Sequence, residues 1–133
     1  MDKREVVVLS GARTAIGDYG GALKDVAPTQ LAATVVREAV KRARIAPQDV
    51  GQLVFGNVIH TEPKDMYLSR VAALEGGLPQ ETVALTLNRL CGSGLQALVS
   101  AAQSIAAGDC DTAVAGGAES MSRGGYLLPT LRW

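Results

Sequence analysis

The sequence has no surplus of either charge and few aromatic residues, and both shortages limit what the protein can do. Among its 133 residues, 13 Lys and Arg balance 13 Asp and Glu, so the formal net charge at pH 7 is zero. A domain that binds DNA or RNA through the phosphate backbone is expected to carry a basic surplus, so nucleic-acid binding becomes a minor hypothesis. Aromatic residues make up only 4%, but hydrophobic residues reach 47%, which predicts one compact folded domain rather than a disordered chain.

Long apolar runs and closely spaced cysteines are also missing. No apolar stretch reaches the ~18 residues that a membrane-spanning helix needs. The charged start of the chain leads directly into a short apolar run with no small-residue cleavage site, so we expect no signal peptide. Cys91 and Cys110 are too far apart for a Cys-x-x-Cys redox or zinc pair. We therefore expect a cytoplasmic protein with free thiols, no metal site and no membrane partner.

Short apolar runs alternate with helical stretches along the chain. Continuous apolar or β-branched runs predict four strands, at 6–9, 53–55, 83–87 and 112–115. Periodicity and Pro or Gly boundaries predict helices between Pro28 and Pro47, at 66–74 and at 95–107. In the first helix the apolar stripe is expected at Leu31, Val35, Ala39 and Ala43. The β-α-β-α-β-α-β order predicts an α/β fold with a mostly parallel sheet and helices on both of its faces.

The predicted helix at 95–107 has almost no polar side. A helix that is apolar on every side is normally buried on every side, so we expect this one at the centre of the fold. A larger side chain at Ala101 or Ala102 should then overpack the interior at a cost of ~1–3 kcal/mol.

Cys91 lies where the strand at 83–87 gives way to this helix, and three interpretations of that position are open. Ligands of open α/β sheets bind at the carboxyl ends of strands, and a helix N-terminus favours a thiolate, so Cys91 is a candidate nucleophile with Gly92 and Gly94 leaving room for a bulky acyl donor. Alternatively, Cys91 is a small buried hydrophobe. In a third interpretation, Gly92-x-Gly94-x-x-Ala97 matches a dinucleotide-binding fingerprint, with Glu119 as the acid that binds the ribose.

A nucleophilic cysteine at this position needs more than the helix terminus. Lowering a thiol pKa by ~2 units takes ~2.7 kcal/mol of differential stabilisation. An exposed helix end typically supplies ~0.3–1 kcal/mol, so a second activating group is required.

At these residues the sequence resembles the thiolases, the acetyl-CoA acetyltransferases and β-ketothiolases. Residues 87–98 (Leu-Asn-Arg-Leu-Cys-Gly-Ser-Gly-Leu-Gln-Ala-Leu) are similar to the acyl-enzyme signature of that family. The resemblance extends in order along the chain to about Tyr126, through residues 10–17 with Gly20 and Gly21, 55–58 and 116–122. The stretch 57–67 is similar to the form found in β-ketothiolases that accept chains somewhat longer than acetyl.

The resemblance implies specific roles for residues around Cys91. Cys91 would take the acyl group of an acyl-CoA as a thioester, and its backbone N–H would hold the thioester oxygen. Gly92, Ser93 and Met121 are candidate substrate-binding residues, although Met121, like Met66, could equally fill the core. The substrates would be acetyl-CoA and other acyl-CoA thioesters, with no further cofactor, in reactions of fatty acid metabolism.

The family also needs groups that residues 1–133 do not supply. These are a His that activates the nucleophile, an Asn that holds a water and a second Cys as acid/base, and their motifs Asn-Glu-Ala-Phe, Gly-His-Pro and Cys-x-Gly-x-Gly are not found here. His60 lies in the wrong segment to replace the missing His, and we expect it in a loop without a special role. Cys110 is expected to pack at a strand start, and Asp109 and Asp111 to lie in a solvated loop.

The resemblance therefore implies the N-terminal half of a thiolase-like fold, part of a five-layered α-β-α-β-α enzyme that works as a dimer or tetramer. Residues 1–120 would form an incomplete domain core and 121–133 the start of a loop region. We expect residues 1–133 alone to lack turnover. The alternatives are a ketoacyl-synthase-like condensing enzyme, a dinucleotide-binding domain that uses Gly92 and Gly94, and a non-catalytic interaction module.

Overall fold

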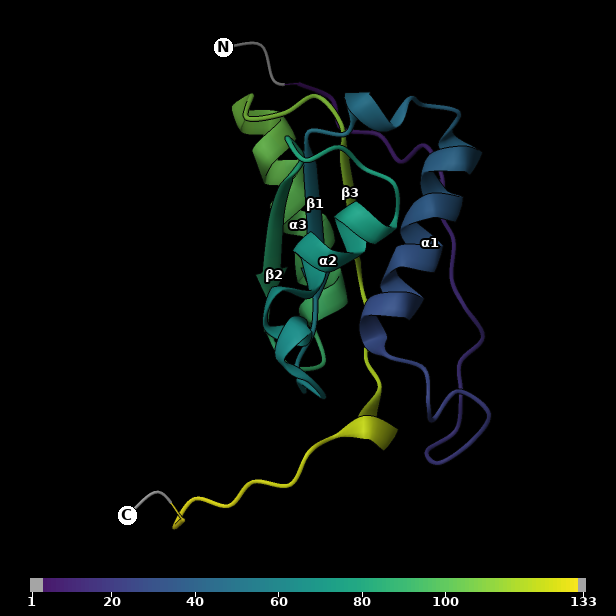
Figure 1. Cartoon of the computed structure of the whole chain (residues 1–133). Coiled ribbons are helices and arrows are strands. Elements are labelled where there is room, and N and C mark those ends of the chain that lie inside the picture. The colour runs from purple at the N-terminus through teal and green to yellow at the C-terminus, as the bar shows by residue number, and fades with distance from the viewer. Residues whose placement is uncertain (1–3, 132–133) are drawn as a thin grey trace.

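The computed structural model describes residues 4–131, in which helices and strands alternate (Figure 1). The six main elements are α1 (Pro28–Ala43), β1 (Gln52–Gly56), α2 (Leu68–Glu75), β2 (Val83–Leu87), α3 (Ser93–Ala107) and β3 (Ala113–Gly117). Three short 3-10 helices lie between or after them, at Pro47–Asp49, Pro63–Tyr67 and Met121–Arg123. The helices α1, α2 and α3 and the strands β1, β2 and β3 were each predicted from the sequence, with small differences at their ends.

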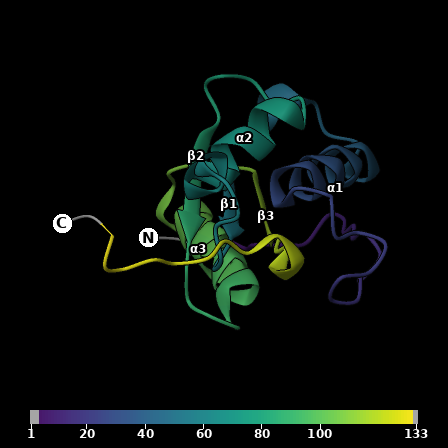
Figure 2. The same cartoon turned by 60° about the horizontal axis from the view of Figure 1, so that its bottom comes forward.

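The strands form one parallel sheet with β1 at its centre. The order is β2-β1-β3, and Leu53 of β1 lies opposite Ala84 on one side and Val114 on the other. Figure 2 shows α1 and α2 on one side of the strands and α3 on the other. The predicted α/β class, with a parallel sheet covered on both faces, is confirmed.

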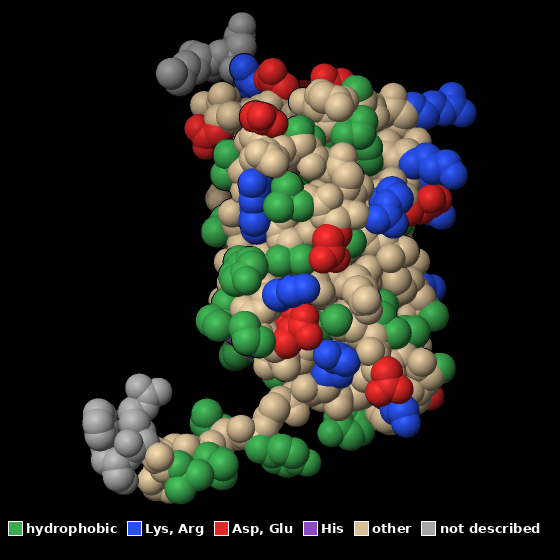
Figure 3. All heavy atoms as spheres, viewed as in Figure 1, with side chains coloured by type: hydrophobic (Ala, Val, Ile, Leu, Met, Phe, Trp, Pro, Cys, Tyr) green, Lys and Arg blue, Asp and Glu red, His purple; other side chains and the backbone are tan. Residues whose placement is uncertain are grey.

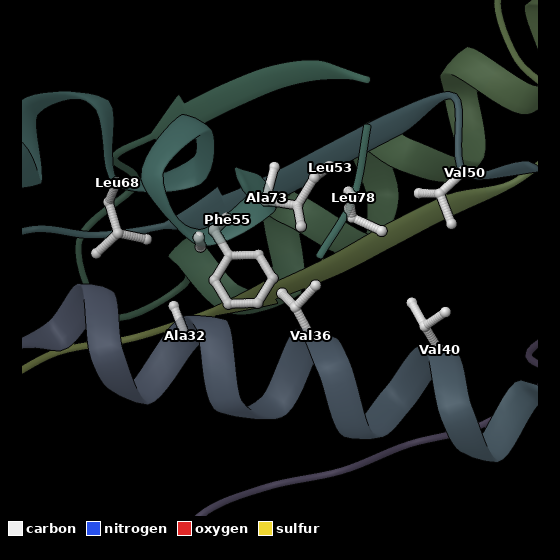
Figure 4. Close-up of a cluster of buried hydrophobic side chains, with 10 residues drawn as sticks. Ala32, Val36, Val40, Val50, Leu53, Phe55, Leu68, Ala73 and Leu78 are labelled. Atoms are coloured by element: carbon white, nitrogen blue, oxygen red, sulfur yellow. The ribbon is translucent and has the colours of Figure 1, made fainter. Parts of the chain in front are cut away.

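The α1/α2 face of the sheet holds most of the buried hydrophobic side chains. Leu53 and Phe55 project from β1 toward α1, where Ala32, Val36 and Val40 recur every four residues (Figure 4). Leu68, Ala72 and Ala73 of α2 close the same cluster, together with Val50 and Leu78. Pro28 begins α1 as predicted, because its fixed φ and missing N–H suit a first helical turn.

The predicted strand at 6–9 is wrong. Residues 4–10 carry no strand, and the side chain of Val8 is 86% exposed. The segment is tied to α1 instead, because Ser10 Oγ donates to the Ala39 carbonyl and Arg42 donates to the Gly11 carbonyl. No strand among residues 4–131 pairs with it, and a β-strand needs a neighbour for its N–H and C=O groups.

A hollow of about 1060 Å³ separates this N-terminal segment from β3. The predicted apolar stripe of α1 lines this hollow: Leu31, Val35, Ala39 and Ala43. The buried apolar stripe of α1 lies one position further along, at Ala32, Val36 and Val40. Leu98, Ala102 and Ile105 of α3 line it from the other side. The sheet layer is therefore open between residues 5–9 and β3, with apolar helix faces above and below the opening.

The expectation that α3 is buried on every side is also wrong. Its buried residues are Ser93, Ala97 and Ala101, whereas Leu95 is 66% exposed and Leu98 and Val99 are exposed as well. The reason is that α3 contacts only one face of the sheet within residues 4–131, so its other sides meet no described neighbour.

Positive and negative side chains are interspersed on the face shown in Figure 3, in keeping with the zero net charge. None of the helices within residues 4–131 combines the length and the hydropathy needed to cross a membrane.

Candidate active site

Cys91 lies in the turn that joins the carboxyl end of β2 to the N-terminus of α3. β2 ends at Leu87 and α3 begins at Ser93, with Gly92 in the N-cap position. The Cys91 side chain is exposed, so the alternative of a small buried hydrophobe is wrong. The carboxyl edge of a parallel sheet is where open α/β folds bind ligands.

A network of hydrogen bonds holds the turn around Cys91. The Ser93 hydroxyl accepts from the Arg89 N–H at 2.8 Å and donates to the Leu90 carbonyl at 2.7 Å. The Asn88 side chain accepts from the Leu90 N–H at 2.9 Å, and the Gly92 N–H donates to the Arg89 carbonyl at 3.1 Å. The residues on both sides of Cys91 are thus fixed by bonds within the turn.

Leu90 has an unusual backbone conformation next to the nucleophile. Its φ of 48° lies in the left-handed region, which non-glycine residues rarely adopt and which costs on the order of 1–3 kcal/mol. Its side chain is exposed, so apolar packing does not offset the cost. The hydrogen bonds of Asn88 and Ser93 to Leu90 hold the residue in this conformation.

Glycines in β1 and β3 let the start of α3 lie directly against the sheet. A Cβ added at Gly56 would lie 2.6 Å from the Ser93 Cβ, and one at Gly117 would lie 3.5 Å from the Gly94 Cα. A side chain at Gly56 would therefore push the N-terminus of α3, and Cys91 with it, away from β1. A Cβ at Gly94 would meet open space, which agrees with the expected room near the nucleophile.

Some backbone N–H groups at and just after Cys91 have no hydrogen-bond acceptor. Within the described residues, the N–H groups of Cys91, Gly94 and Leu95 donate no hydrogen bond. Such groups at a helix start carry a partial positive charge and suit a thiolate or an oxyanion.

Glu119 and Asn57 join the carboxyl ends of β3 and β1. The Glu119 carboxylate accepts from the Asn57 side chain at 3.2 Å, the Val58 N–H at 3.0 Å and the Ile59 N–H at 2.9 Å. Asn57 also donates to the Ala118 carbonyl. The sequence analysis missed this link, because its partners are about sixty residues apart and only the β1/β3 pairing brings them together.

Asp65 is a second buried polar residue that the sequence analysis missed. Its carboxylate is fully buried and accepts from the Thr61 N–H, the Thr61 hydroxyl and the Glu62 N–H. The local signal for this turn is Pro63 directly after the N-cap Glu62, since Pro is favoured in the first turn of a helix.

The other predicted residues fall in different places. His60 is exposed, and Met66 and Met121 are exposed rather than in the core. Met121 lines the hollow beside β3, whereas Cys91, Gly92 and Ser93 do not, so the described residues do not bring Met121 into one pocket with the nucleophile. The substrate contacts of Gly92, Ser93 and Met121 stay predictions.

Cys110 differs from Cys91 in its surroundings. Burial raises the pKa of the Cys110 thiol, and the nearby carboxylates of Asp109 and Asp111 raise it further. A Cβ added at Gly51 would lie 2.9 Å from the Cys110 Cβ, so this cysteine packs against the start of β1. Within residues 4–131 no three His, Cys, Asp or Glu side chains gather closely enough to hold a metal ion.

Comparisons with known proteins agree with this geometry. Residues 6–133 match the family of thiolase N-terminal domains. The chain is 67% identical over 130 residues to the β-ketothiolase BktB of Cupriavidus necator, a match that covers 98% of this chain and 33% of that protein. It is 43% identical over 130 residues to an acetyl-CoA acetyltransferase of Syntrophomonas wolfei, again with 98% of this chain and 33% of that protein covered.

Solved structures give the same result. The crystal structure of the Bacillus anthracis acetyl-CoA acetyltransferase superposes with a TM-score of 0.94 at 40% identity, over 98% of this chain and 33% of that one. Human mitochondrial 3-ketoacyl-CoA thiolase in complex with CoA superposes with a TM-score of 0.92 at 38% identity, over 95% of this chain and 32% of that one.

The parallel sheet, the cysteine before α3 and these matches define an α/β domain of the thiolase-like fold. The chain belongs to the thiolase family, as an N-terminal domain of it. It spans about a third of the length of the relatives that it matches. Membership in this family favours the thiolase interpretation over the ketoacyl-synthase and dinucleotide-binding alternatives.

Proposed function

We propose that the protein to which these residues belong is an acyl-CoA C-acyltransferase, a thiolase with Cys91 as its nucleophile. The observation that carries the proposal is the exposed Cys91 in a rigid turn at the N-terminus of α3, on a chain 67% identical to a β-ketothiolase. Relatives named acetyl-CoA acetyltransferase and 3-ketoacyl-CoA thiolase support the same substrate class, thioesters of CoA.

In the proposed reaction Cys91 is acylated and then deacylated. The Cys91 thiolate attacks the carbonyl carbon of an acyl-CoA, a C–S bond to Cys91 forms, and the bond to CoA breaks so that CoA leaves as a thiolate and takes up a proton. A base from outside residues 1–133 takes the α-proton of a second acyl-CoA, and the resulting carbanion attacks the acyl-enzyme carbonyl. The C–C bond of a 3-oxoacyl-CoA forms, the C–S bond to Cys91 breaks, and Cys91 leaves as a thiolate. Thiolysis is the reverse. In this proposal the N–H of Cys91, which donates no hydrogen bond within the described residues, would hold the carbonyl oxygen as negative charge develops on it.

The base that activates Cys91 would come from outside residues 1–133. His60 is the only histidine of the chain and is exposed in the loop after β1. No hydrogen bond joins it to the turn of Cys91 within the described residues. We therefore propose that residues 1–133 alone do not turn over acetoacetyl-CoA, even where Cys91 is slowly acylated.

The open sheet layer supports the proposal that residues 1–120 form an incomplete domain core and that the loop region starts at 121. The hollow beside β3 has a volume of about 1060 Å³ and is lined by apolar residues of α1 and α3, which supports a place for a further β-strand. We propose that a strand from the remaining two thirds of a thiolase chain lies there, which would bury Val6–Leu9 and pair the free edge of β3.

A second apolar edge supports assembly. β2 is the outer strand on the other side of the sheet, and its Val83 and Leu85 are exposed. We propose that a second subunit covers this edge in a homodimer or homotetramer, in the cytoplasm, and that the enzyme serves fatty acid metabolism with acyl chains somewhat longer than acetyl.

A chimera tests the proposed function. The 130 aligned residues of this chain would replace the matching third of the C. necator β-ketothiolase, with Cys91→Ala in the same chimera as the control. We expect acetoacetyl-CoA thiolysis by the chimera and none by its Cys91→Ala variant. A folded chimera without thiolysis, or one whose activity survives Cys91→Ala, would overturn the proposal, and the first of these results would favour the non-catalytic interaction module.

A further inference from the structure

The Ser93 hydroxyl is used inside the turn that carries Cys91. Ser93 is 5% exposed and follows Cys91 in the chain. Its Oγ reaches back past Cys91 to the two residues that precede it, since it accepts from the Arg89 N–H and donates to the Leu90 carbonyl. The Ser93 backbone N–H also donates to the Leu90 carbonyl at 3.0 Å. One residue thus makes three hydrogen bonds to the two residues that precede Cys91.

Ser93 is itself held in place by the sheet. Its Cβ lies where a side chain on Gly56 would collide with it at 2.6 Å, so the first residue of α3 rests directly on the backbone of β1. The hydroxyl therefore connects a rigid strand to the turn, and it opposes the relaxation of Leu90 out of its left-handed φ of 48°.

We propose that Ser93 is a positioning residue for Cys91: its hydroxyl fixes the turn from Arg89 to Gly92 and so sets where the thiolate meets the carbonyl carbon of an acyl-CoA. This inference rests on the proposed function. It gives Ser93 a role that acts through Cys91 and requires no contact with substrate. Loss of alignment by about 1 Å can cost on the order of a hundredfold in rate, so the effect is expected in kcat rather than in KM.

The test uses three variants in the active chimera described above. Ser93→Ala removes the hydroxyl, Ser93→Thr keeps it, and Ser100→Ala removes a serine hydroxyl two turns later on the same helix, where it accepts only from the Gln96 side chain. We expect Ser93→Ala to lower kcat for acetoacetyl-CoA thiolysis by on the order of ten- to a hundredfold with KM changed by less than about twofold. Ser93→Thr should recover most of that loss, and Ser100→Ala should match the parent.

Amide hydrogen exchange supplies a second measurement that is independent of turnover. Ser93→Ala should speed exchange in the peptide that covers residues 88–95 and leave the peptides of α1 and β1 unchanged, which also shows that the variant is folded. An unchanged kcat in Ser93→Ala, or equal losses in Ser93→Ala and Ser100→Ala, would overturn the positioning role. A parent chimera without thiolysis would instead overturn the proposed function, and the exchange comparison would still show whether Ser93 holds the turn.

Discussion

The two faces of the sheet are built very differently. On the α1/α2 face, ten buried side chains form one cluster around Leu53 and Phe55. On the α3 face, the buried cluster consists of Val54, Ala97 and Ala101. The same strand, β1, contributes to both, because its side chains alternate between the faces. The α3 face, next to the turn of Cys91, is the sparsely packed one.

This difference indicates that the two faces of the sheet have different roles in the domain. The α1/α2 face can hold the sheet together with its own residues, since its apolar side chains already find partners. The α3 face has small residues at the sheet and exposed leucines elsewhere on the helix, so apolar surface stays uncovered next to the turn of Cys91. An exposed apolar surface of this kind is typical of an interface.

The largest expected effect comes from matched leucines on opposite faces. Leu53→Ala removes a fully buried side chain of the α1/α2 cluster and should lower the free energy of unfolding by about 2–5 kcal/mol. Leu87→Ala is the same change at a partly buried residue of the α3 cluster and should cost less than half as much. Urea denaturation of the two variants measures the difference. Equal losses would mean that the α3 face is as well packed as the other.

A smaller effect separates two neighbouring alanines of α3. Ala101 is 5% exposed against β1 and β3, so Ala101→Leu should overpack that contact and cost ~1–3 kcal/mol. Both alanines border the hollow, but Ala102 is only partly buried, so Ala102→Leu has room and should change stability by less than about 0.5 kcal/mol. The melting midpoints of both variants provide the measurement. A destabilising Ala102→Leu would argue that the hollow is closed in solution.

The two cysteines offer a chemical comparison between the open turn and a packed loop. Cys91 is exposed, whereas burial and the neighbouring Asp109 and Asp111 raise the pKa of Cys110, so less of Cys110 is thiolate than of an ordinary cysteine at the same pH. Brief iodoacetamide treatment at neutral pH should therefore label Cys91 first, with Cys110 labelled only as the pH rises. Peptide mapping checks this order, and equal or reversed labelling would contradict it.

The smallest expected effect concerns Leu98, on the side of α3 that borders the hollow. Leu98→Ser replaces a side chain that is half exposed and should leave the stability of the chain within about 0.5 kcal/mol. We expect residues 1–133 to self-associate through their exposed apolar side chains, and Leu98→Ser should reduce this association because it removes part of that surface. Sedimentation velocity of the two chains measures this, and an unchanged association would place the contact elsewhere.

Local signals in the sequence were enough to place most elements. Residues 83–87 were predicted as a strand and form β2, and Pro28 marked the start of α1. The start of α2 was placed two residues early, because the 3-10 turn at Pro63–Tyr67 precedes it. These features depend on neighbours a few residues apart, which the sequence displays directly.

Features that depend on distant partners could not be predicted in this way. The prediction of a strand at 6–9 was wrong because a strand needs a neighbour with which to pair. The exposure of Leu95 likewise depends on which segments lie beside α3. The position of Cys91 was predicted, but the hydrogen bonds of Ser93 around it were not. A serine at a helix start has several possible partners, and only the close approach of Gly56 selects one arrangement.

Trapping the acyl-enzyme would show directly whether Cys91 is the nucleophile. The chimera would be mixed with acetyl-CoA, quenched in acid and examined by intact mass and peptide mapping, next to its Cys91→Ser and Cys110→Ser variants. The account predicts one acetyl group on the peptide that contains Cys91, retained in Cys110→Ser and lost in Cys91→Ser. An acetyl group on Cys110, or an active chimera whose Cys91 is never acylated, would contradict it.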